Sequence, residues 1–226
     1  MISRVTAALL DIDGTFVRSN DAHAKAWSEA AAEFGFLRPL EFFRRLIGMG
    51  GDRILPCIDA TLSAERKPGS QIAARRGEIF AERYLPGLRP TAGGQELVRR
   101  LFLDDIRCVV ASSAKTDEIE GLLKAAGIDE YITVTTTSDD AGRSKPAPDI
   151  VTVALRKSRV SANEAVLVGD TPYDVEAGAR AGVRVLAVRC GGWSDEALKG
   201  AAMIFNDPAD ILAHYEQTPF ATTRRA

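Results

Sequence analysis

The sequence predicts an α/β fold in which a mostly parallel sheet has helices on both faces and carries an inserted all-helical unit. Short runs of Val, Ile, Leu and Ala alternate with segments of helical periodicity, and several runs lack polar alternation. After the first run, about 70 residues contain no convincing strand. Continuous apolar runs are typical of parallel strands covered on both faces, and their alternation with helices favours crossover connections.

Six strands are expected, and their ranges in chain order are 5–12, 106–112, 131–135, 165–169, 183–188 and, as the weakest, 203–205. The helical patterns between the later strands cover residues 93–103, 116–126, 147–157 and 171–181. Thr116 stands at a helix-capping position, and Gly127 and Gly182 follow the last periodic residues of their helices. This order predicts a Rossmann-like arrangement.

The inserted unit is predicted to span residues 18–86, with helices at 22–34, 40–47, 52–62 and 71–85. Residues 1–17 and 87–226 then form the α/β core domain. Because the insertion follows the first strand directly, it is placed to act as a lid over that strand's carboxyl end. The Arg-Arg pairs at 75–76 and 99–100 are interpreted as solvated helix faces.

The composition is that of a globular protein, with 46% hydrophobic and 27% charged residues among 226. A formal net charge of −2 argues against a general nucleic-acid binder. Cys57, Cys108 and Cys190 are scattered, which favours a reduced setting. No apolar run approaches 18 residues and no signal-peptide pattern is present. We therefore expect a cytoplasmic protein without a membrane partner, as a monomer or small homo-oligomer.

Polar side chains follow four of the predicted strands, at the edge where ligands bind in parallel α/β sheets. Close carboxylates repel each other, and a divalent cation together with a lysine would relieve that repulsion. Oxygen ligands without His or Cys favour Mg²⁺, and Mg²⁺ beside a lysine and a serine suits a phosphoryl group. The candidates are Asp11, Asp13, Ser112, Ser113, Lys115, Lys145, Asp170 and Asp174.

Each candidate also has a plainer interpretation. The Asp11 and Asp13 pair could be a solvated turn, Ser112 an ordinary strand-end residue and Lys145 a surface turn lysine before proline. Asp170 could cap the next helix. A purely structural Asp174 would look the same as a functional one. The combination of all of them at one edge favours a functional site.

Four segments, "LLDIDGTF", "VVASS", "SKPAPD" and "VGDTPYDVEAGARAG", resemble the haloacid dehalogenase superfamily, and they occur in that family's order across the whole core. The resemblance is to the phosphatase branch with a small helical cap. Within the insertion, "SNDAHAKAW" and "LIGMGGDR" are similar to caps of phosphoglycolate phosphatase-like and β-phosphoglucomutase-like members.

The resemblance implies a role for each core residue. Asp11 would be the nucleophile that forms an aspartyl-phosphate, and Asp13 the general acid and then the base. Mg²⁺ would bind the Asp11 carboxylate, the backbone carbonyl of Asp13, and Asp170. Ser112 would donate to phosphoryl oxygens, and Lys145 would offset the negative charge. Because Asp13 must carry a proton to act as the acid, its pKa is predicted to be raised in the substrate complex.

The remaining candidates are supporting residues. Ser113 is a second phosphate-binding candidate, and Asp174 is expected to support the loop or the water shell of the metal. His23, Arg53 and Lys115 are the candidates for substrate contact, with a passive helix residue, a surface ion pair and a solvated lysine as alternatives.

Arg18 departs from the pattern, because many relatives carry an acidic residue at this hinge position. An arginine there would attract an anion or only alter the hinge, and it weakens any transfer of a relative's substrate to this chain.

The function expected from the resemblance is a Mg²⁺-dependent phosphatase for a small phosphorylated metabolite, such as phosphoglycolate or a sugar phosphate. A β-phosphoglucomutase-like phosphosugar mutase is the alternative, since its core would look nearly the same. A carbon–halogen hydrolase fits less well, because that chemistry needs neither Mg²⁺ nor an acid at position 13. A non-catalytic phosphometabolite-binding protein would bind without turnover.

Overall fold

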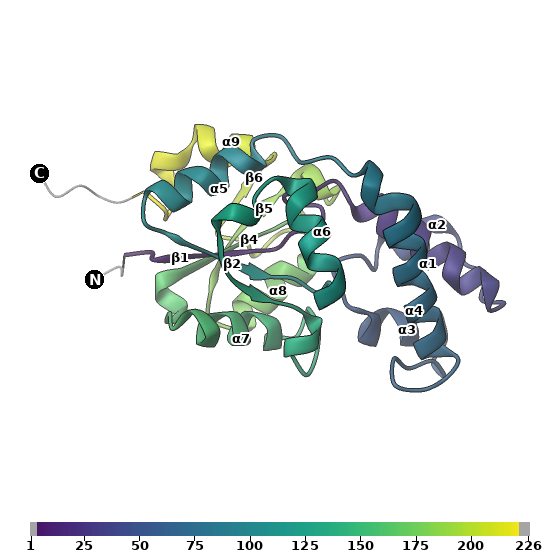
Figure 1. Ribbon diagram of the computed structural model, residues 1–226. Coiled ribbons are helices and arrows are strands. Elements are labelled where there is room, and N and C mark those ends of the chain that lie inside the picture. Colours follow the sequence, from purple (N-terminus) through teal and green to yellow (C-terminus); the bar gives the residue numbers. More distant parts are fainter. Residues whose placement is uncertain (1–3, 222–226) are drawn as a thin grey trace, which may run out of the picture.

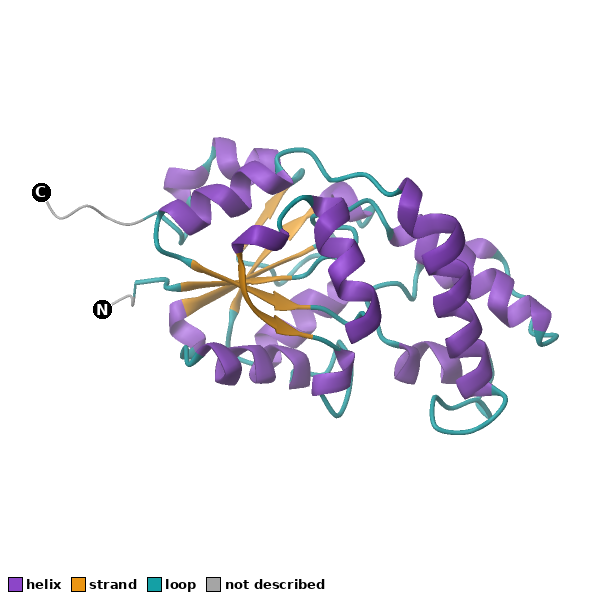
Figure 2. Cartoon of the chain, in the orientation of Figure 1, coloured by secondary structure: helices purple, strands orange, loops and turns teal. Residues whose placement is uncertain are grey.

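The computed structural model describes residues 4–221 and is built around a six-stranded parallel sheet (Figures 1 and 2). The strand order is β3-β2-β1-β4-β5-β6. The strands are β1 (Ala7–Leu10), β2 (Arg107–Ala111), β3 (Ile132–Thr136), β4 (Ala165–Gly169), β5 (Arg184–Val188) and β6 (Met203–Phe205). The predicted α/β class with a parallel sheet is therefore confirmed.

Helices cover both faces of this sheet, as its uninterrupted apolar strands require. Ala8 and Leu10 of β1 pack into one hydrophobic cluster and Ala7 and Leu9 into a second one. The first cluster includes residues of α5 (Gly94–Leu103), α6 (Thr116–Ala126) and α9 (Pro208–Ala213). The second includes residues of α7 (Asp149–Ser158) and α8 (Pro172–Arg180). Figure 1 shows these two layers on opposite sides of the sheet.

Between β1 and α5 the described chain is helical and contains isolated bridges but no strand. The helices are α1 (Asn20–Glu33), α2 (Leu40–Arg44), α3 (Gly51–Ile58) and α4 (Gly69–Ile79), followed by a π-helical turn at Phe80–Tyr84. In Figure 1 they lie at the end of the molecule opposite the two termini. The boundaries 18–86 for a separate cap domain stay a prediction.

Helix α3 is shorter than the predicted 52–62. It ends at Ile58 because Asp59 has extended backbone angles, with φ −156° and ψ 135°. The Asp59 side chain accepts a hydrogen bond from the Thr61 backbone N–H at 2.9 Å. This local bond competes with the helix, as short polar side chains often do.

The strand register brings the candidate residues to one edge. Leu10 lies opposite Val110 of β2 and Val168 of β4. Asp11 therefore follows β1 at the same level at which β2 and β4 end, and its backbone N–H still donates to the Val168 carbonyl at 2.9 Å. The carboxyl ends of the three central strands thus open onto one site.

Gly14 makes the tight turn after β1 possible. Its φ is +78°, in the left-handed region that side chains disfavour. A β-carbon at this position would lie 2.3 Å from Asp170 Oδ2. The absence of a side chain lets the turn and Asp170 approach each other.

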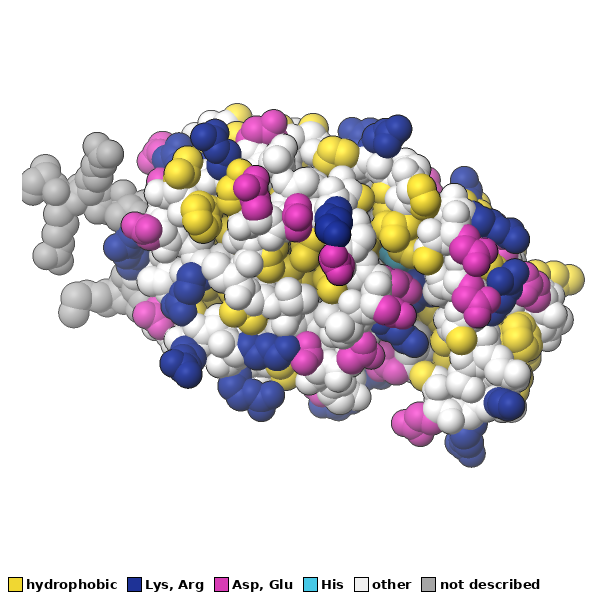
Figure 3. Space-filling view, viewed as in Figure 1, with side chains coloured by type: hydrophobic (Ala, Val, Ile, Leu, Met, Phe, Trp, Pro, Cys, Tyr) yellow, Lys and Arg dark blue, Asp and Glu magenta, His cyan; other side chains and the backbone are white. Residues whose placement is uncertain are grey.

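The surface mixes both signs of charge. Figure 3 shows Lys and Arg side chains interspersed with Asp and Glu over the visible face. Among residues 4–221, no helix combines the length and the apolar character that crossing a bilayer requires.

Candidate active site

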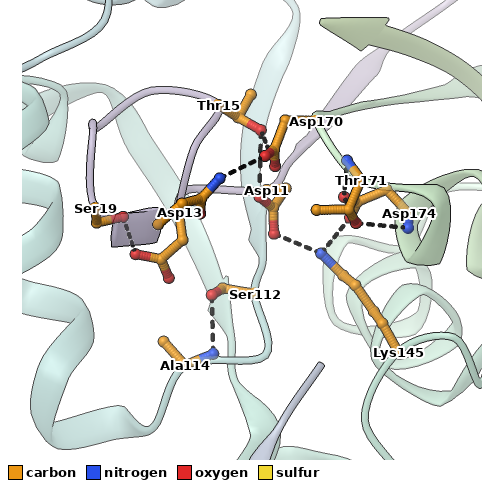
Figure 4. A network of polar contacts seen from close by, with 11 residues as sticks. Asp11, Asp13, Thr15, Ser19, Ser112, Ala114, Lys145, Asp170, Thr171 and Asp174 are labelled. Atoms are coloured by element: carbon orange, nitrogen blue, oxygen red, sulfur yellow. Dashed lines mark hydrogen bonds and ion pairs between the residues drawn. The ribbon is translucent and has the colours of Figure 1, made fainter. Parts of the chain in front are cut away.

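Asp11 lies at the centre of a buried polar cluster (Figure 4). Its Oδ1 is 2.6 Å from Lys145 Nζ, and its Oδ2 accepts a hydrogen bond from Thr15 at 3.2 Å. Asp170, which follows β4, accepts from Thr15 at 3.2 Å and from the Asn20 amide at 2.8 Å. Asp11 and Asp170 are far apart in the sequence, and they meet here because β1 and β4 are adjacent in the sheet.

Asp174 is the third carboxylate of the cluster. Its Oδ2 accepts from the Thr171 hydroxyl at 2.6 Å and from the Thr171 N–H at 3.1 Å, a capping box at the start of α8. Its Oδ1 is 2.6 Å from Lys145 Nζ. Asp174 therefore caps α8 and pairs with the site's lysine, and its role at the water shell of the metal stays a prediction.

Lys145 is completely buried between Asp11 and Asp174. Burial by itself would lower its pKa, but the charges of the two carboxylates outweigh burial and raise it. Burial and the charge of Asp174 raise the pKa of Asp11 well above its ordinary value, against the opposing charge of Lys145. Burial and then Asp174 raise the pKa of Asp170 to about 7. One lysine does not balance three carboxylates.

This donor set fits a divalent cation. One oxygen each from Asp11, Asp170 and Asp174 lies within 4.8 Å of the others. Three buried carboxylates with no sulfur or imidazole ligand match the preference of Mg²⁺ for oxygen. Burial and mutual repulsion raise the pKa values of Asp11 and Asp170, and a bound cation would oppose both effects.

Asp13 lies in a different environment, so its carboxylate is not part of that set. Its Oδ1 is 2.7 Å from His23 Nε2 and accepts from the Ser19 hydroxyl at 2.5 Å. The His23 ring stacks on Phe80, with ring centroids 3.9 Å apart. The structure thus brings His23 of the insertion onto Asp13.

The pKa of Asp13 is lowered in this structure. Burial would raise it, but the charge and hydrogen bond of His23 and the hydrogen bond of Ser19 outweigh burial. The raised pKa that we predict for the substrate complex is therefore not a property of the free site. The two aspartates of "DID" therefore have pKa shifts of opposite direction: the surroundings disfavour the anionic form of Asp11 and favour that of Asp13.

Ser112 and Ser113 follow β2 and line a cavity of about 40 Å³ with Asp11, Asp13 and His23. Ser112 Oγ accepts from the Ala114 N–H at 3.0 Å. Ser113 Oγ is buried and has no hydrogen-bond partner among residues 4–221. A phosphoryl oxygen in the cavity would find both hydroxyls nearby.

A larger cavity of about 320 Å³ adjoins the first, and both include Trp27, Gly51, Arg76 and Ser113 in their walls. Lys115 lines this larger space. Arg53 lines neither cavity. Its Nε is 3.7 Å from Asp52 Oδ2 of its own helix, as in the surface ion pair that was the alternative.

A buried ion pair at the boundary of the two cavities escaped the sequence analysis. Arg76 of α4 donates to both carboxylate oxygens of Glu118 of α6, at 2.7 and 2.8 Å. Its guanidinium also lies 5.3 Å from the Trp27 ring. Arg76 is only 7% exposed, so its interpretation as a solvated residue is wrong. Arg75 does lie at the surface, in ion pairs with Glu33 and Glu78.

Replacing Arg76 with methionine is expected to lower the free energy of unfolding by about 3–5 kcal/mol, because Glu118 would keep a buried, unpaired charge. The double change Arg76→Met with Glu118→Leu is expected to cost less than the single change. The matched control is Arg83 with Glu29, whose side chains are 55% and 35% exposed and whose removal should cost ~1 kcal/mol or less. Urea denaturation measures the single, double and control variants. A double variant no more stable than Arg76→Met would contradict this account.

Comparison with known proteins gives consistent matches to a family model, to a relative and to solved structures. The family model described as haloacid dehalogenase-like hydrolase matches residues 8–188. Pyrophosphatase PpaX of Listeria innocua is 27% identical over 186 residues, covering 80% of this chain and 82% of that protein.

Among solved structures, a hydrolase from Pseudomonas syringae superposes with a TM-score of 0.87 and 26% identity, over 94% of this chain and 98% of that one. CbbY from Rhodobacter sphaeroides, solved in complex with phosphate, has a TM-score of 0.78 and 25% identity, over 92% of this chain and 96% of that one. The fold of this chain is thus shared with a hydrolase and with a protein solved in complex with phosphate.

Proposed function

Because the chain belongs to the haloacid dehalogenase-like hydrolase family, we propose that it is a Mg²⁺-dependent phosphatase that acts on a small phosphorylated metabolite through an aspartyl-phosphate at Asp11. The observation that carries the proposal is the geometry around Asp11. A buried carboxylate touches Lys145, lies next to two further carboxylates, and faces a cavity lined by Asp13 and Ser112. Mg²⁺, held by Asp11, Asp170 and the Asp13 carbonyl, would neutralise charge on the transferring phosphoryl group.

In the first step a carboxylate oxygen of Asp11 attacks phosphorus, and the bond from phosphorus to the leaving oxygen breaks. Asp13 gives its proton to that oxygen. In the second step Asp13 takes a proton from water, whose oxygen attacks phosphorus, and the bond from phosphorus to Asp11 breaks. Inorganic phosphate leaves and Asp11 is restored. Lys145 keeps Asp11 oriented and offsets its charge in both steps.

Asp13 is expected to take up its proton when the substrate binds. The pKa of Asp13 is low in the free site because of His23 and Ser19. A phosphoryl group carrying negative charge in the same cavity would raise that pKa. His23 is thus a positioning residue, because it fixes the Asp13 carboxylate and sets the balance between its two protonation states.

The small cavity at the aspartates has room for little beyond a phosphoryl group, so the leaving group would occupy the larger adjoining cavity near Lys115. A phosphate-release assay over phosphoglycolate, hexose and pentose phosphates, nucleotide monophosphates and pyrophosphate tests the proposal. Pyrophosphate is included because the Listeria relative carries that name. Turnover should need Mg²⁺ and stop in EDTA; EDTA-resistant turnover would exclude the proposed metal.

A phosphosugar mutase is the second candidate. The observation that favours it is the contact of His23 with Asp13, because an Asp13 held in place could take the proton of a bound sugar hydroxyl instead of that of water. The same assay separates the two functions. Isomerised sugar phosphate in excess of inorganic phosphate would favour the mutase, and phosphate release alone the phosphatase.

Mg²⁺ affinity is expected to fall as the pH drops below 7. The pKa of Asp170 is raised to about 7, so below that pH the metal must displace a proton. One displaced proton weakens apparent affinity about tenfold per pH unit. Calorimetric titration with Mg²⁺ at several values between pH 5.5 and 8 measures this, and a constant affinity across the range would contradict it.

Replacing His23 with phenylalanine should move the acidic limb of the rate profile for p-nitrophenyl phosphate to higher pH. This activated ester needs no acid for its leaving group, so the limb reports the anionic Asp13 that takes a proton from water. Loss of the His23 charge and hydrogen bond raises the pKa of Asp13. Ser19→Ala should shift the acidic limb in the same direction but by less. An acidic limb that stays at the same pH in both variants would show that His23 does not set the pKa of Asp13.

A further inference from the structure

A third cavity, of about 300 Å³, lies where the chain passes between the α/β sheet and the helical insertion. Its walls come from the turn after β1, the start of α1, the end of α2, the segment before α5, and the residues Cys190 and Asp207. It includes none of the residues that line the two cavities of the candidate active site. We call this cavity the hinge pocket.

Arg18 presents a free positive charge to the hinge pocket. Its side chain is exposed and makes no hydrogen bond or ion pair with any residue in the range 4–221. Its backbone is held, because the Arg18 N–H donates to the Arg89 carbonyl at 2.9 Å. Arg44, the other arginine in the wall, is already bound to Asp21 at 2.7 Å and to the Gly191 carbonyl. Arg18 is therefore the guanidinium that a ligand would meet without displacing a partner.

Asp207 presents a charge of the opposite sign. Its Oδ1 caps α9 by accepting from the Asp210 N–H at 2.9 Å. The side chain is half-buried and lines the hinge pocket, and its Oδ2 makes no hydrogen bond or ion pair with residues 4–221. Asp207 and Arg18 line the same cavity, and neither forms an ion pair within the described residues. Both charges act on the pKa of the Cys190 thiol, Asp207 raising it and Arg18 lowering it, while burial is the largest cause of its increase.

We propose that the hinge pocket is a second ligand site, for a small organic anion that carries hydroxyl groups. The anionic group binds Arg18, and a hydroxyl donates to Asp207. A guanidinium without an ion-pair partner and a carboxylate with one oxygen left for a ligand line the same cavity. This combination favours a ligand with both an anionic group and a hydroxyl group over a simple anion. The volume of about 300 Å³ suits a molecule of a few carbon atoms with a phosphate or carboxylate group.

The site is connected to the metal cluster through Asn20. This residue lines the hinge pocket and is 5% exposed, and its amide donates to Asp170 Oδ2 at 2.8 Å and to the Gly191 carbonyl at 3.3 Å. A ligand in the hinge pocket therefore lies against a residue that holds Asp170. The binding proposal itself does not depend on the proposed phosphatase activity.

Calorimetric titration with glycerol 1-phosphate in EDTA tests the proposal. EDTA prevents metal-dependent turnover and leaves Asp11, Asp170 and Asp174 without a cation, which disfavours an anion in the catalytic cavity. The wild-type chain is expected to bind one molecule. Arg18→Ala should weaken binding by about tenfold or more, since a charge-assisted hydrogen bond is lost. The matched control Arg89→Ala removes the same charge from an exposed neighbour outside the pocket and should change affinity by less than about twofold.

Asp207→Asn examines the second contact, and asparagine keeps the ability to cap α9. This substitution should weaken the binding of glycerol 1-phosphate, because a carboxylate accepts a hydrogen bond from a hydroxyl group more strongly than an amide does. Sulfate, which has no hydroxyl group at neutral pH, should bind this variant at least as well as the wild type. No binding by the wild type in EDTA, or equal losses in Arg18→Ala and Arg89→Ala, would overturn the proposal. A loss in Ser112→Ala as large as that in Arg18→Ala would place the ligand in the catalytic cavity and also overturn it.

Discussion

Asp11→Asn is expected to abolish phosphate release while leaving the fold intact. An asparagine amide does not act as the nucleophile, and the loss of a covalent nucleophile typically lowers kcat by roughly 10⁴-fold or more. Asparagine is similar in size, and Lys145 keeps its second partner, Asp174, at 2.6 Å. Initial rates with the best substrate of the panel, beside circular dichroism and urea denaturation, measure both parts.

Asp139→Asn is the matched control for this variant. Asp139 is exposed in the wall of the larger cavity and accepts a hydrogen bond from the Thr116 N–H at 2.9 Å, which asparagine can also accept. It should retain activity within a few-fold of the wild type, because it removes a nearby charge without touching the nucleophile. Full activity in Asp11→Asn would refute the mechanism. Equal losses of activity in Asp11→Asn and Asp139→Asn would show that the loss comes from removing a negative charge and not from removing the nucleophile.

Lys145→Met is expected to cost about 3–5 kcal/mol of unfolding free energy in EDTA, because removing one partner from a buried ionic cluster leaves the others uncompensated. Asp11 and Asp174 would both lose a cation at 2.6 Å. Mg²⁺ should restore part of the stability, since a ligand that binds only the folded state stabilises it. Urea denaturation with EDTA and with Mg²⁺ measures both effects.

Lys124→Met is the corresponding surface control. Lys124 pairs with Glu120 at 2.6 Å, but its side chain is 62% exposed. Because water screens this exposed pair, its loss should leave the free energy of unfolding nearly unchanged, with no response to Mg²⁺. A Lys145→Met variant as stable as Lys124→Met in EDTA would show that the buried carboxylates do not need the lysine.

The sheet was predictable because its strands are covered on both faces and therefore lack polar residues. Apolar runs such as that ending at Leu10 identify central strands, and the residues that follow parallel strands meet at one edge. This reasoning brings Asp11, Ser112, Lys145 and Asp170 together before any coordinates are known. Strand ends were less predictable, since β1 stops at Leu10 rather than at Ile12.

Contacts between the insertion and the core were harder to predict. Residues 75 and 76 are adjacent in the sequence but point about 100° apart on a helix, so one is solvated and the other buried. The partner of Arg76 is Glu118 on α6, and no periodicity in the sequence indicates that pairing. The role of Asn20 at Asp170 and that of Ser19 at Asp13 depend in the same way on how the chain turns after Gly14.

Chemical trapping of the covalent intermediate tests the central claim most directly. The wild-type chain is mixed with Mg²⁺ and its best substrate, quenched within one turnover, and reduced with borohydride, which converts an aspartyl-phosphate into homoserine. Peptide mass spectrometry should find homoserine at position 11 only when substrate and Mg²⁺ are both present. Turnover with no modification of Asp11, or with the modification at another aspartate, would contradict the account.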